Sequence, residues 1–216
     1  PNGELCLADA SDAAHSSVGD IVREYQAKYQ HIVYKKIENK GIAANTNAAA
    51  ELASGEYLAL ADHDDILAPH AMYTMGQAIR QLREAGEPDG FLYSDEALFT
   101  KKIEKPLVAH FKPDYAPDYL LCCNYICHLA VFRRELFEQV GGERPECDGS
   151  QDHDLFLRLI EQVGGAAHVP QVLYYWRVHE GSTSGGTDAK PYVAKAAKKA
   201  LADHLERTGR TGTIED

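Results

Sequence analysis

The sequence predicts an α/β fold with a mostly parallel central sheet and helices on both of its faces. In the first 96 residues, short apolar segments with strand character alternate with segments of helical periodicity. Parallel strands need crossover connections, usually helices, and these helices cover both faces of the sheet. A length of 216 residues suits one compact domain with a sizeable core. We therefore expect a single domain.

Two β-α-β units are predicted in the first part of the chain. The first has an apolar strand at residues 5–8, apolar residues at helical spacing over 18–25, and the strand "HIVYKKI". In the second, "GIAANTNAAAELA" is rich in helix-forming Ala, Gly55 is expected to cap its C-terminus, and "YLALA" is a short apolar strand.

A further helix is expected over residues 69–84, with Pro69 in its first turn, and "FLYSDE" follows as a strand. From residue 97 the alternation stops, and "KKIEKPLVAHFKPDYAPDYLLCCNYICH" predicts an irregular loop with a short helix. The remaining expected elements are the strand "LAVFR", a helix at 133–140, the turn "GGERPE", a helix at 152–163, the strand "AHVPQVLYYWRV" and a helix at 191–208. "GSTSGGTD", residues 181–188, is expected to be mobile, as a lid or a linker.

The charge balance limits the partners of the chain. Lys and Arg number 22 against 33 Asp and Glu, a net charge of -11, which argues against nucleic acid and leaves at most peripheral membrane association. No apolar run approaches the roughly 18 residues of a membrane span. Five cysteines without a secretory leader indicate a cytoplasmic protein, at most at the inner face of the cytoplasmic membrane. Because "PNGEL" enters a strand at once without Met, we expect the chain to begin inside a domain.

Four ionisable residues follow the strand "YLALA" in the stretch "LALADHDDILAPH". Ligands of open α/β sheets bind beyond the carboxyl ends of the strands, which is where this cluster lies. If the strand persists, Asp62 and Asp64 point to the same side and would repel each other unless a cation lies between them. A hard divalent ion that also binds substrate phosphates meets this need. The alternative is that one of the Asp residues caps the helix that starts near Pro69.

Zinc binding is a weaker interpretation of another cluster. Cys122, Cys123, Cys127 and His128 contain no CxxC pair, so we expect buried thiols there rather than a zinc site. Trp176 and the two preceding tyrosines are expected in the core.

Five segments resemble, in order and spacing, those of bacterial inverting glycosyltransferases of family two, which have the GT-A fold. They are "NKGIAANTNAAAELASGEYLALADHDDILAPHAM", "YSDE", "FKPDYAPDYLLCCNYICHLAVFRRE", "DGSQDHDLFLRL" and "VLYYWRVHEGSTS". The resemblance covers residues 1–208 and implies one GT-A domain over 1–216, with a nucleotide-binding half (1–96), an acceptor half (97–190) and a C-terminal helix (191–208). Family members have one more apolar strand before "PNGEL", so the resemblance also implies a domain that lacks its first strand.

The resemblance implies a donor site around the acidic cluster. It assigns Asp64 to a Mg²⁺ or Mn²⁺ ion on the donor diphosphate and Asp62 to a position near the ribose. Asp9 matches a residue at the nucleobase, although Ala10 stands where the family usually has a second Asp. The residues expected beside the nucleotide are Asn39, Gly41 and Asn47.

The resemblance also implies a catalytic base and an acceptor side. Asp152 matches the base of the family's Glu-Asp motif, with Gln151 in place of the Glu; the alternative is that Asp152 only caps its helix. His179 matches a histidine that completes the metal shell in some relatives. The candidates for contact with the donor sugar or acceptor are Asp95, Asn124, Tyr125 and His128, and the alternative for them is ordinary packing or a solvated loop.

The expected function is transfer of a sugar, with inversion, from a nucleotide-diphospho-sugar to a carbohydrate or lipid-linked glycan acceptor in surface polysaccharide synthesis. UDP or dTDP sugars are the expected donors. Two alternatives stay open: a nucleotidyltransferase that makes sugar nucleotides, and a non-catalytic sugar-binding module. A haloacid-type phosphatase is disfavoured because Ile66 stands where its motif needs Thr.

Overall fold

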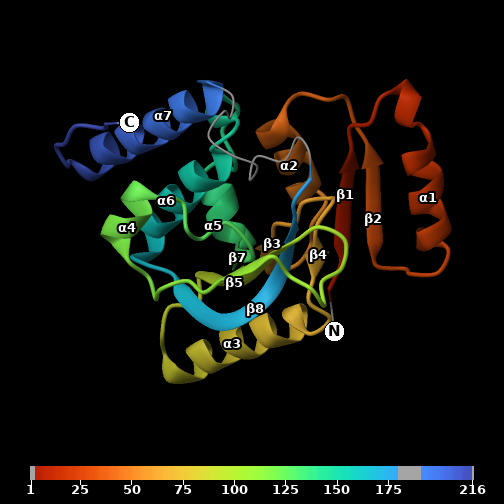
Figure 1. The fold of residues 1–216 in the computed structure, drawn as a ribbon, viewed down its shortest axis with the longest axis horizontal. Helices are drawn as coiled ribbons and strands as arrows, with labels where there is room; N and C mark the ends of the chain where they lie inside the picture. The colour runs from red at the N-terminus through yellow and green to blue at the C-terminus, as the bar shows by residue number, and fades with distance from the viewer. Residues whose placement is uncertain (1–2, 180–190, 216) are drawn as a thin grey trace.

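The computed structural model describes residues 3–179 and 191–215. Two sheets organise this part of the chain (Figure 1). A two-stranded parallel sheet pairs β1 (Leu5–Asp9) with β2 (Ile32–Lys36), and a six-stranded sheet carries the other strands. The segment "GSTSGGTD" at 181–188, which was expected to be mobile, lies outside the described residues.

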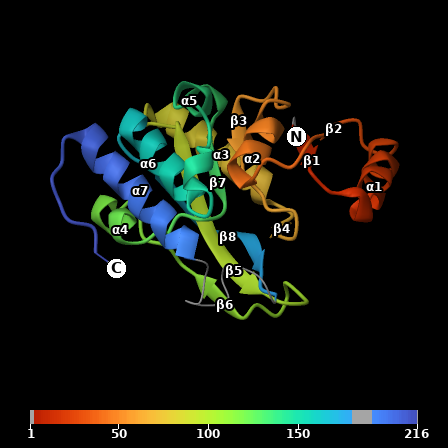
Figure 2. The same cartoon turned by 90° about the horizontal axis from the view of Figure 1, so that it is seen from above.

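The first β-α-β unit forms as predicted. A 3₁₀ turn (η1, Ala13–His15) and α1 (Ser17–Gln26) connect β1 to β2, and α2 (Ile42–Ala50) follows. Asp12 caps η1, because its side-chain oxygen accepts hydrogen bonds from the N–H groups of Ala14 and His15. Figure 2 shows α1 and β2 at one end of the molecule, with α2 between them and the large sheet.

The large sheet has the order β3 (Tyr57–Ala59), β7 (Ala130–Arg133), β5 (Phe91–Phe99), β8 (Ala167–Arg177), β4 (Ile66–Leu67), and β6 (Val108–His110) pairs with β5. This order confirms the α/β class, but the sheet is mixed rather than mostly parallel. The β5–β8 pairing is parallel, whereas β3–β7, β5–β7, β4–β8 and β5–β6 are antiparallel. The sheet is mixed because β7 inserts between β3 and β5 and runs antiparallel to both. In addition, short turns rather than helices precede β4 and β6.

Helices cover both faces of this sheet, as predicted. Figure 1 shows α3 (Ala71–Ala85) on one side and α4 (Pro117–Cys122), α5 (Arg134–Gln139) and α6 (Gln151–Val163) on the other. The 3₁₀ turn η2 (Pro145–Cys147) precedes α6, and α7 (Pro191–Thr208) lies beside it. Two apolar cores result, one including Phe91, Phe132 and Phe156, the other including Met75 and Leu173. Among the described helices, none has both the length and the apolar composition of a membrane span.

Three local predictions are wrong. Helix α2 ends at Ala50, and Gly55 does not cap it, because the Gly55 N–H donates instead to Glu4 at 2.8 Å. Helix α3 begins at Ala71, so Pro69 lies before its first turn, and no Asp side chain caps it. Cys122 and Cys123 are exposed rather than buried, because α4 is a single short helix at the surface.

Candidate active site

The acidic cluster forms a turn, not a strand extension. Strand β3 ends at Ala59, and the Asp65 N–H donates to the Asp62 carbonyl at 3.3 Å. The alternation that would place Asp62 and Asp64 on one side therefore does not apply. The turn directs the carboxylates of Asp62 and Asp64 to different partners on different segments.

Asp65 anchors this turn to β8. Its carboxylate accepts hydrogen bonds from the Arg177 N–H and the Tyr174 hydroxyl, both at 2.7 Å. The Arg177 Nε–H donates to the Asp64 carbonyl at 2.6 Å, which fixes the same turn from its other side. Burial raises the pKa of Asp65, and the charges of Asp62 and Asp64 add to this. Asp65 is thus the residue that orients the turn.

Asp64 and His179 come together across 115 positions of sequence. Asp64 Oδ2 and His179 Nε2 are 2.9 Å apart, and both side chains are partly exposed. A carboxylate oxygen and an imidazole nitrogen at this separation can coordinate one divalent ion, because both are established ligands of Mn²⁺-like metals. The structure therefore brings together the two residues that were expected to hold the metal.

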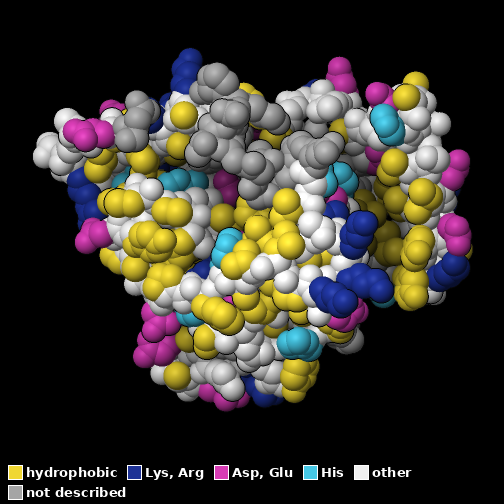
Figure 3. All heavy atoms as spheres, in the orientation of Figure 1, with side chains coloured by type: hydrophobic (Ala, Val, Ile, Leu, Met, Phe, Trp, Pro, Cys, Tyr) yellow, Lys and Arg dark blue, Asp and Glu magenta, His cyan; other side chains and the backbone are white. Residues whose placement is uncertain are grey.

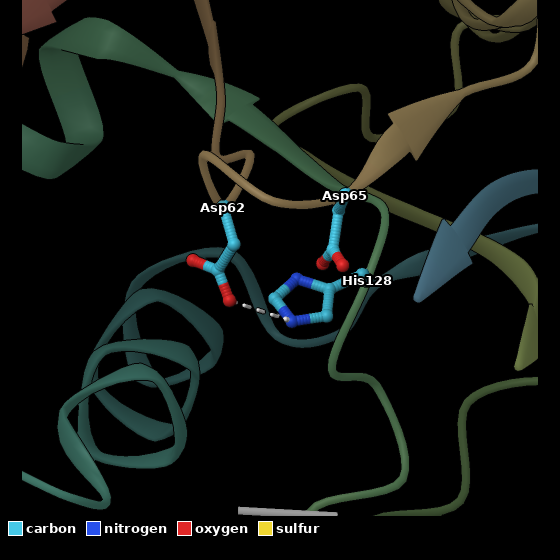
Figure 4. Close-up of side chains that lie close together, drawn as sticks. All are labelled: Asp62, Asp65 and His128. Atoms are coloured by element: carbon cyan, nitrogen blue, oxygen red, sulfur yellow. Dashed lines mark ion pairs between the residues drawn. The ribbon is translucent and has the colours of Figure 1, made fainter. Parts of the chain in front are cut away.

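A second group that could hold a cation lies beside this pair (Figure 4). The ligand atoms of Asp62, Asp65 and His128 lie within 4.8 Å of one another, and Asp62 Oδ2 is 3.7 Å from His128 Nε2. The His128 ring stacks on Tyr174 with ring centroids 4.6 Å apart. Because both oxygens of Asp65 already accept hydrogen bonds, Asp64 and His179 are the better donor set.

Asp152 lies in the first turn of α6 and pairs with Asn124. The Asn124 amide donates to Asp152 Oδ2 at 2.8 Å, although 28 residues separate them. The helix N-cap is Ser150, so the interpretation of Asp152 as the cap is wrong.

Tyr125 and Asp95 do not occupy open positions in this structure. Tyr125 is buried, its hydroxyl accepts from the Ala116 N–H at 2.9 Å, and its ring stacks on Tyr119. Asp95 is only 2% exposed, and its Oδ1 contacts the Lys112 N–H and His168 Nε2, each at 2.9 Å. Ordinary packing describes both residues, because Asp95 lies within strand β5 and the Tyr125 ring packs between Tyr93 and Tyr119.

Asp9 ends β1 in a network of its own. Its carboxylate accepts from the Ser11 N–H at 2.8 Å and the Tyr34 hydroxyl at 2.7 Å, and Lys36 Nζ lies 3.1 Å away. Burial by itself would raise the pKa of Asp9, but these hydrogen bonds hold it well below its usual value. Its contact with a nucleobase stays a prediction.

The block of Asn39, Gly41 and Asn47 supports the loop before α6. Asn39 Oδ1 accepts from the Gly41 N–H at 3.2 Å, which shapes the start of α2. The Asp148 carboxylate accepts from the N–H groups of the first turn of α2, at 2.9 Å from Ala43. Gly41 has φ 101°, and a Cβ there would lie 2.5 Å from Asp148 Oδ2, so glycine is needed at this position.

Asn47 binds the same loop through both ends of its amide. Its Nδ2 donates to the Glu143 carbonyl and its Oδ1 accepts from the Glu143 N–H, both at 2.8 Å. Gly142 has φ 70°, and a Cβ there would lie 2.5 Å from Asn47 Oδ1. The block expected beside the nucleotide thus also sets the loop that leads to Asp152.

Replacing Asn47 by Ala is expected to lower the free energy of unfolding by about 2 kcal/mol, because it leaves the Glu143 backbone groups unpaired. Urea unfolding checks this. Asn45→Ala, in the same helix but with solvent-exposed hydrogen bonds, is the control and should cost about 0.5 kcal/mol. Equal losses in the two variants would contradict the role given to Asn47.

Glu143 is a site residue that sequence analysis missed. It is 3% exposed, and its Oε2 is buried with no hydrogen-bond partner among the residues that the structure describes. Burial raises its pKa to about 8, and the negative charges of Asp152, Asp148 and Asp62 contribute, against a hydrogen bond from Thr46. The turn "GGERPE" carried no signal for this, because a Glu in a turn is ordinarily solvated.

Residues 4–141, more than half of the chain, match the family described as Glycosyl transferase family 2. The chain belongs to this family. A related protein, the uncharacterized protein y4gI of Sinorhizobium fredii, is 39% identical over 96% of the chain. The O-antigen biosynthesis protein RfbC of Myxococcus xanthus is 31% identical over 97% of it. The chain spans 22% and 16% of the length of these two relatives.

Solved structures of glycosyltransferases share the fold of this family 2 chain. S. aureus TarS 1-349 in complex with UDP-GlcNAc superposes with a TM-score of 0.70 at 14% identity, covering 98% of this chain and 59% of TarS. The mannosyltransferase PcManGT of Pyrobaculum calidifontis, in complex with GDP-Man and Mn²⁺, superposes with a TM-score of 0.55 at 18% identity. The match covers 98% of this chain and 56% of the PcManGT chain. These likenesses confirm the GT-A fold.

Proposed function

We propose that the protein is an inverting glycosyltransferase that moves a sugar from a nucleotide-diphospho-sugar to a carbohydrate or lipid-linked glycan acceptor in polysaccharide synthesis. The observation that carries the proposal is the approach of Asp64 to His179, at 2.9 Å, beside a carboxylate on the first turn of α6. Membership in family 2 and the O-antigen relative support the reaction class.

Asp64 and His179 would hold a Mg²⁺ or Mn²⁺ ion. Their donor atoms suit such an ion, and the Mn²⁺ complex of a structural neighbour supports this choice. When bound, the ion supplies positive charge that stabilises the departing diphosphate. The Arg177 Nε–H and the Asp65 carboxylate hold the turn that carries Asp64 in place.

Asp152 would act as the general base on the acceptor hydroxyl. Asn124 donates to Asp152 Oδ2 and so orients the carboxylate at the first turn of α6. A base must take the hydroxyl proton as the oxygen attacks the anomeric carbon, and an ionised, oriented carboxylate can accept it.

The donor is proposed to be a UDP or dTDP sugar, held near Asp9, Asn39, Gly41, Asn47 and Asp62. TarS, with UDP-GlcNAc, supports a uridine donor, whereas PcManGT, with GDP-Man, adds guanosine donors to those worth testing. We place the acceptor on the side of Asn124 and His128.

Asp64→Asn in the full-length protein is expected to weaken Mn²⁺-dependent binding of UDP about 10-fold or more, because the variant loses an anionic metal ligand. Isothermal titration with UDP, with and without Mn²⁺, measures this. His63→Ala is the control, since His63 is an exposed neighbour in the same turn and should leave the affinity unchanged.

Equal UDP affinities for Asp64→Asn and the wild type, both dependent on Mn²⁺, would remove Asp64 from the metal site. If neither UDP nor dTDP binds, the donor assignment is wrong; binding of GDP alone would make the donor a guanosine sugar nucleotide. Formation of nucleotide sugar from a sugar phosphate and a nucleoside triphosphate would instead make the protein a nucleotidyltransferase.

A further inference from the structure

The connection between β5 and β6 projects from the body of the molecule. Figure 2 shows this hairpin as the part that extends furthest beyond α3 and the sheet on its side. A tight turn shapes its end, since the Lys105 N–H donates to the Lys102 carbonyl at 3.2 Å. We define residues 101–111 as the hairpin tip: they comprise this turn, strand β6, and Phe111 at the end of β6 remote from the turn.

The hairpin tip is basic in an acidic protein. Lys101, Lys102 and Lys105 are exposed there, with Glu104 as the only acidic residue, while the whole chain carries a net charge of -11. In Figure 3, Lys and Arg side chains gather over the place where Figure 1 draws the end of this connection. The tip therefore presents a local positive charge to an anionic partner.

The same segment exposes large apolar side chains. Phe111 is 78% exposed, Leu107 is 60% exposed and Val108 is 45% exposed. Lys residues alone would be ordinary protection of an edge strand, but such protection does not call for an almost fully exposed Phe. Lysines interleaved with Phe, Leu and Val are the composition of a surface that enters the interface of an anionic bilayer.

The base of the hairpin is firmly held. The Arg177 guanidinium lies over the Phe99 ring, 4.4 Å from its centroid, and donates to the Thr100 carbonyl at 3.3 Å. At the other end, the buried Lys112 Nζ lies 3.2 Å from Glu96 and donates to the Ile126 carbonyl. Because the base is fixed, docking would not have to order the hairpin backbone, and this lowers the entropic cost of binding through the exposed apolar side chains.

We propose that the hairpin tip docks on the surface of a membrane rich in anionic lipids, with its lysines at the headgroups and Phe111 and Leu107 at the boundary of the acyl chains. Arg177 connects the tip to the acidic turn, because the same guanidinium donates to Asp64. Docking would thus bring the candidate active site to the membrane surface. The inference does not depend on sugar transfer, because it concerns binding alone.

Co-sedimentation of the full-length protein with vesicles tests the proposal. Vesicles of equal parts phosphatidylglycerol and phosphatidylcholine should bind the wild type, and phosphatidylcholine vesicles should bind it much less. The double substitution Lys101→Glu and Lys102→Glu should lower binding about 10-fold or more, since each lysine near an anionic surface contributes to the attraction. Phe111→Ser should lower binding to a smaller extent, and high salt should lower it for the wild type.

Matched variants keep the test specific. Lys35→Glu with Lys195→Glu makes the same charge change on other exposed surfaces, and Tyr73→Ser removes a 69% exposed aromatic from α3. Equal loss in the control and hairpin variants would overturn the proposal, as would failure of the wild type to bind anionic vesicles. Strong protection from hydrogen exchange over residues 101–106, which precede the amides that pair with β5, would in the absence of vesicles mean that another part of the protein covers the turn, and would also overturn the proposal.

Discussion

Replacing Asp152 by Asn in the full-length protein is expected to reduce turnover about 100- to 10,000-fold, the usual contribution of a general base. The variant keeps the shape of the side chain and the helix position, but it cannot accept the acceptor proton. The measurement is release of nucleoside diphosphate from a donor sugar under saturating donor and acceptor. Donor affinity should stay close to that of the wild type, because the proposed donor contacts lie elsewhere.

Two further variants separate proton transfer from positioning. Asn124→Ala removes the hydrogen bond that orients Asp152 and should lower turnover by a smaller factor, about 10-fold. Asp12→Asn, at an exposed carboxylate that caps η1, should leave turnover unchanged. Near-normal turnover in a folded, donor-binding Asp152→Asn protein would show that another group takes the proton.

Replacing Glu143 by Gln is expected to raise the free energy of unfolding by about 3 kcal/mol at pH 7. Burial and nearby carboxylates raise the pKa of Glu143 from 4.5 to about 8, so the folded protein holds a proton that the unfolded chain releases. Between these two values, each pH unit costs the wild type about 1.4 kcal/mol of stability. Gln is neutral at every pH and escapes this penalty.

The sign of the effect gives a specific pH profile. Below pH 4.5 the two proteins should be equally stable, the difference should grow as the pH rises to about 8, and it should then stay constant. Urea unfolding across this range checks the profile. Glu146→Gln, an exposed residue of the same loop, is the control and should run parallel to the wild type. Parallel curves for Glu143→Gln as well would mean that Glu143 is ionised in the folded protein without cost.

A buried carboxyl that destabilises the protein needs a reason to be there. The charges of Asp152 and of Asp62 in the acidic turn act on Glu143, so a role in the candidate active site is the simplest reason to keep it. Functional sites commonly retain groups that lower the stability of the protein. The residue before Asp152 is Gln151, which is neutral, and Glu143 supplies a carboxyl whose pKa the charge of Asp152 raises.

Local pattern was enough to predict most elements. Strand β1, helix α1 and strand β2 form where their apolar periodicity indicates, and α6 and α7 occupy almost the predicted ranges. Strands β4 and β6 were not predicted, and β6 lies in the segment that was expected to be an irregular loop. Strands of two or three residues carry too little pattern to be recognised, and their direction depends on the partner strand.

The site could be predicted only in part for a similar reason. The motif resemblance named Asp64, His179, Asp152 and Asn124, and the structure pairs them as Asp64 with His179 and Asp152 with Asn124. It also named Tyr125 and Asp95, which lie in the interior. A motif records residue type and spacing, but not whether a neighbouring segment covers the side chain.

The sequence by itself determined the α/β class, the position of most helices and strands, and the family to which the chain belongs, because these depend on local periodicity and on ordered motifs. Only the tertiary structure decided that the acidic turn divides Asp62 from Asp64, that Asn47 holds the Glu143 backbone, and that Glu143 is buried among carboxylates. These features depend on contacts between segments up to 115 residues apart. The charge, burial and partners of a side chain are set by whichever segments fold against it, and local sequence does not specify them.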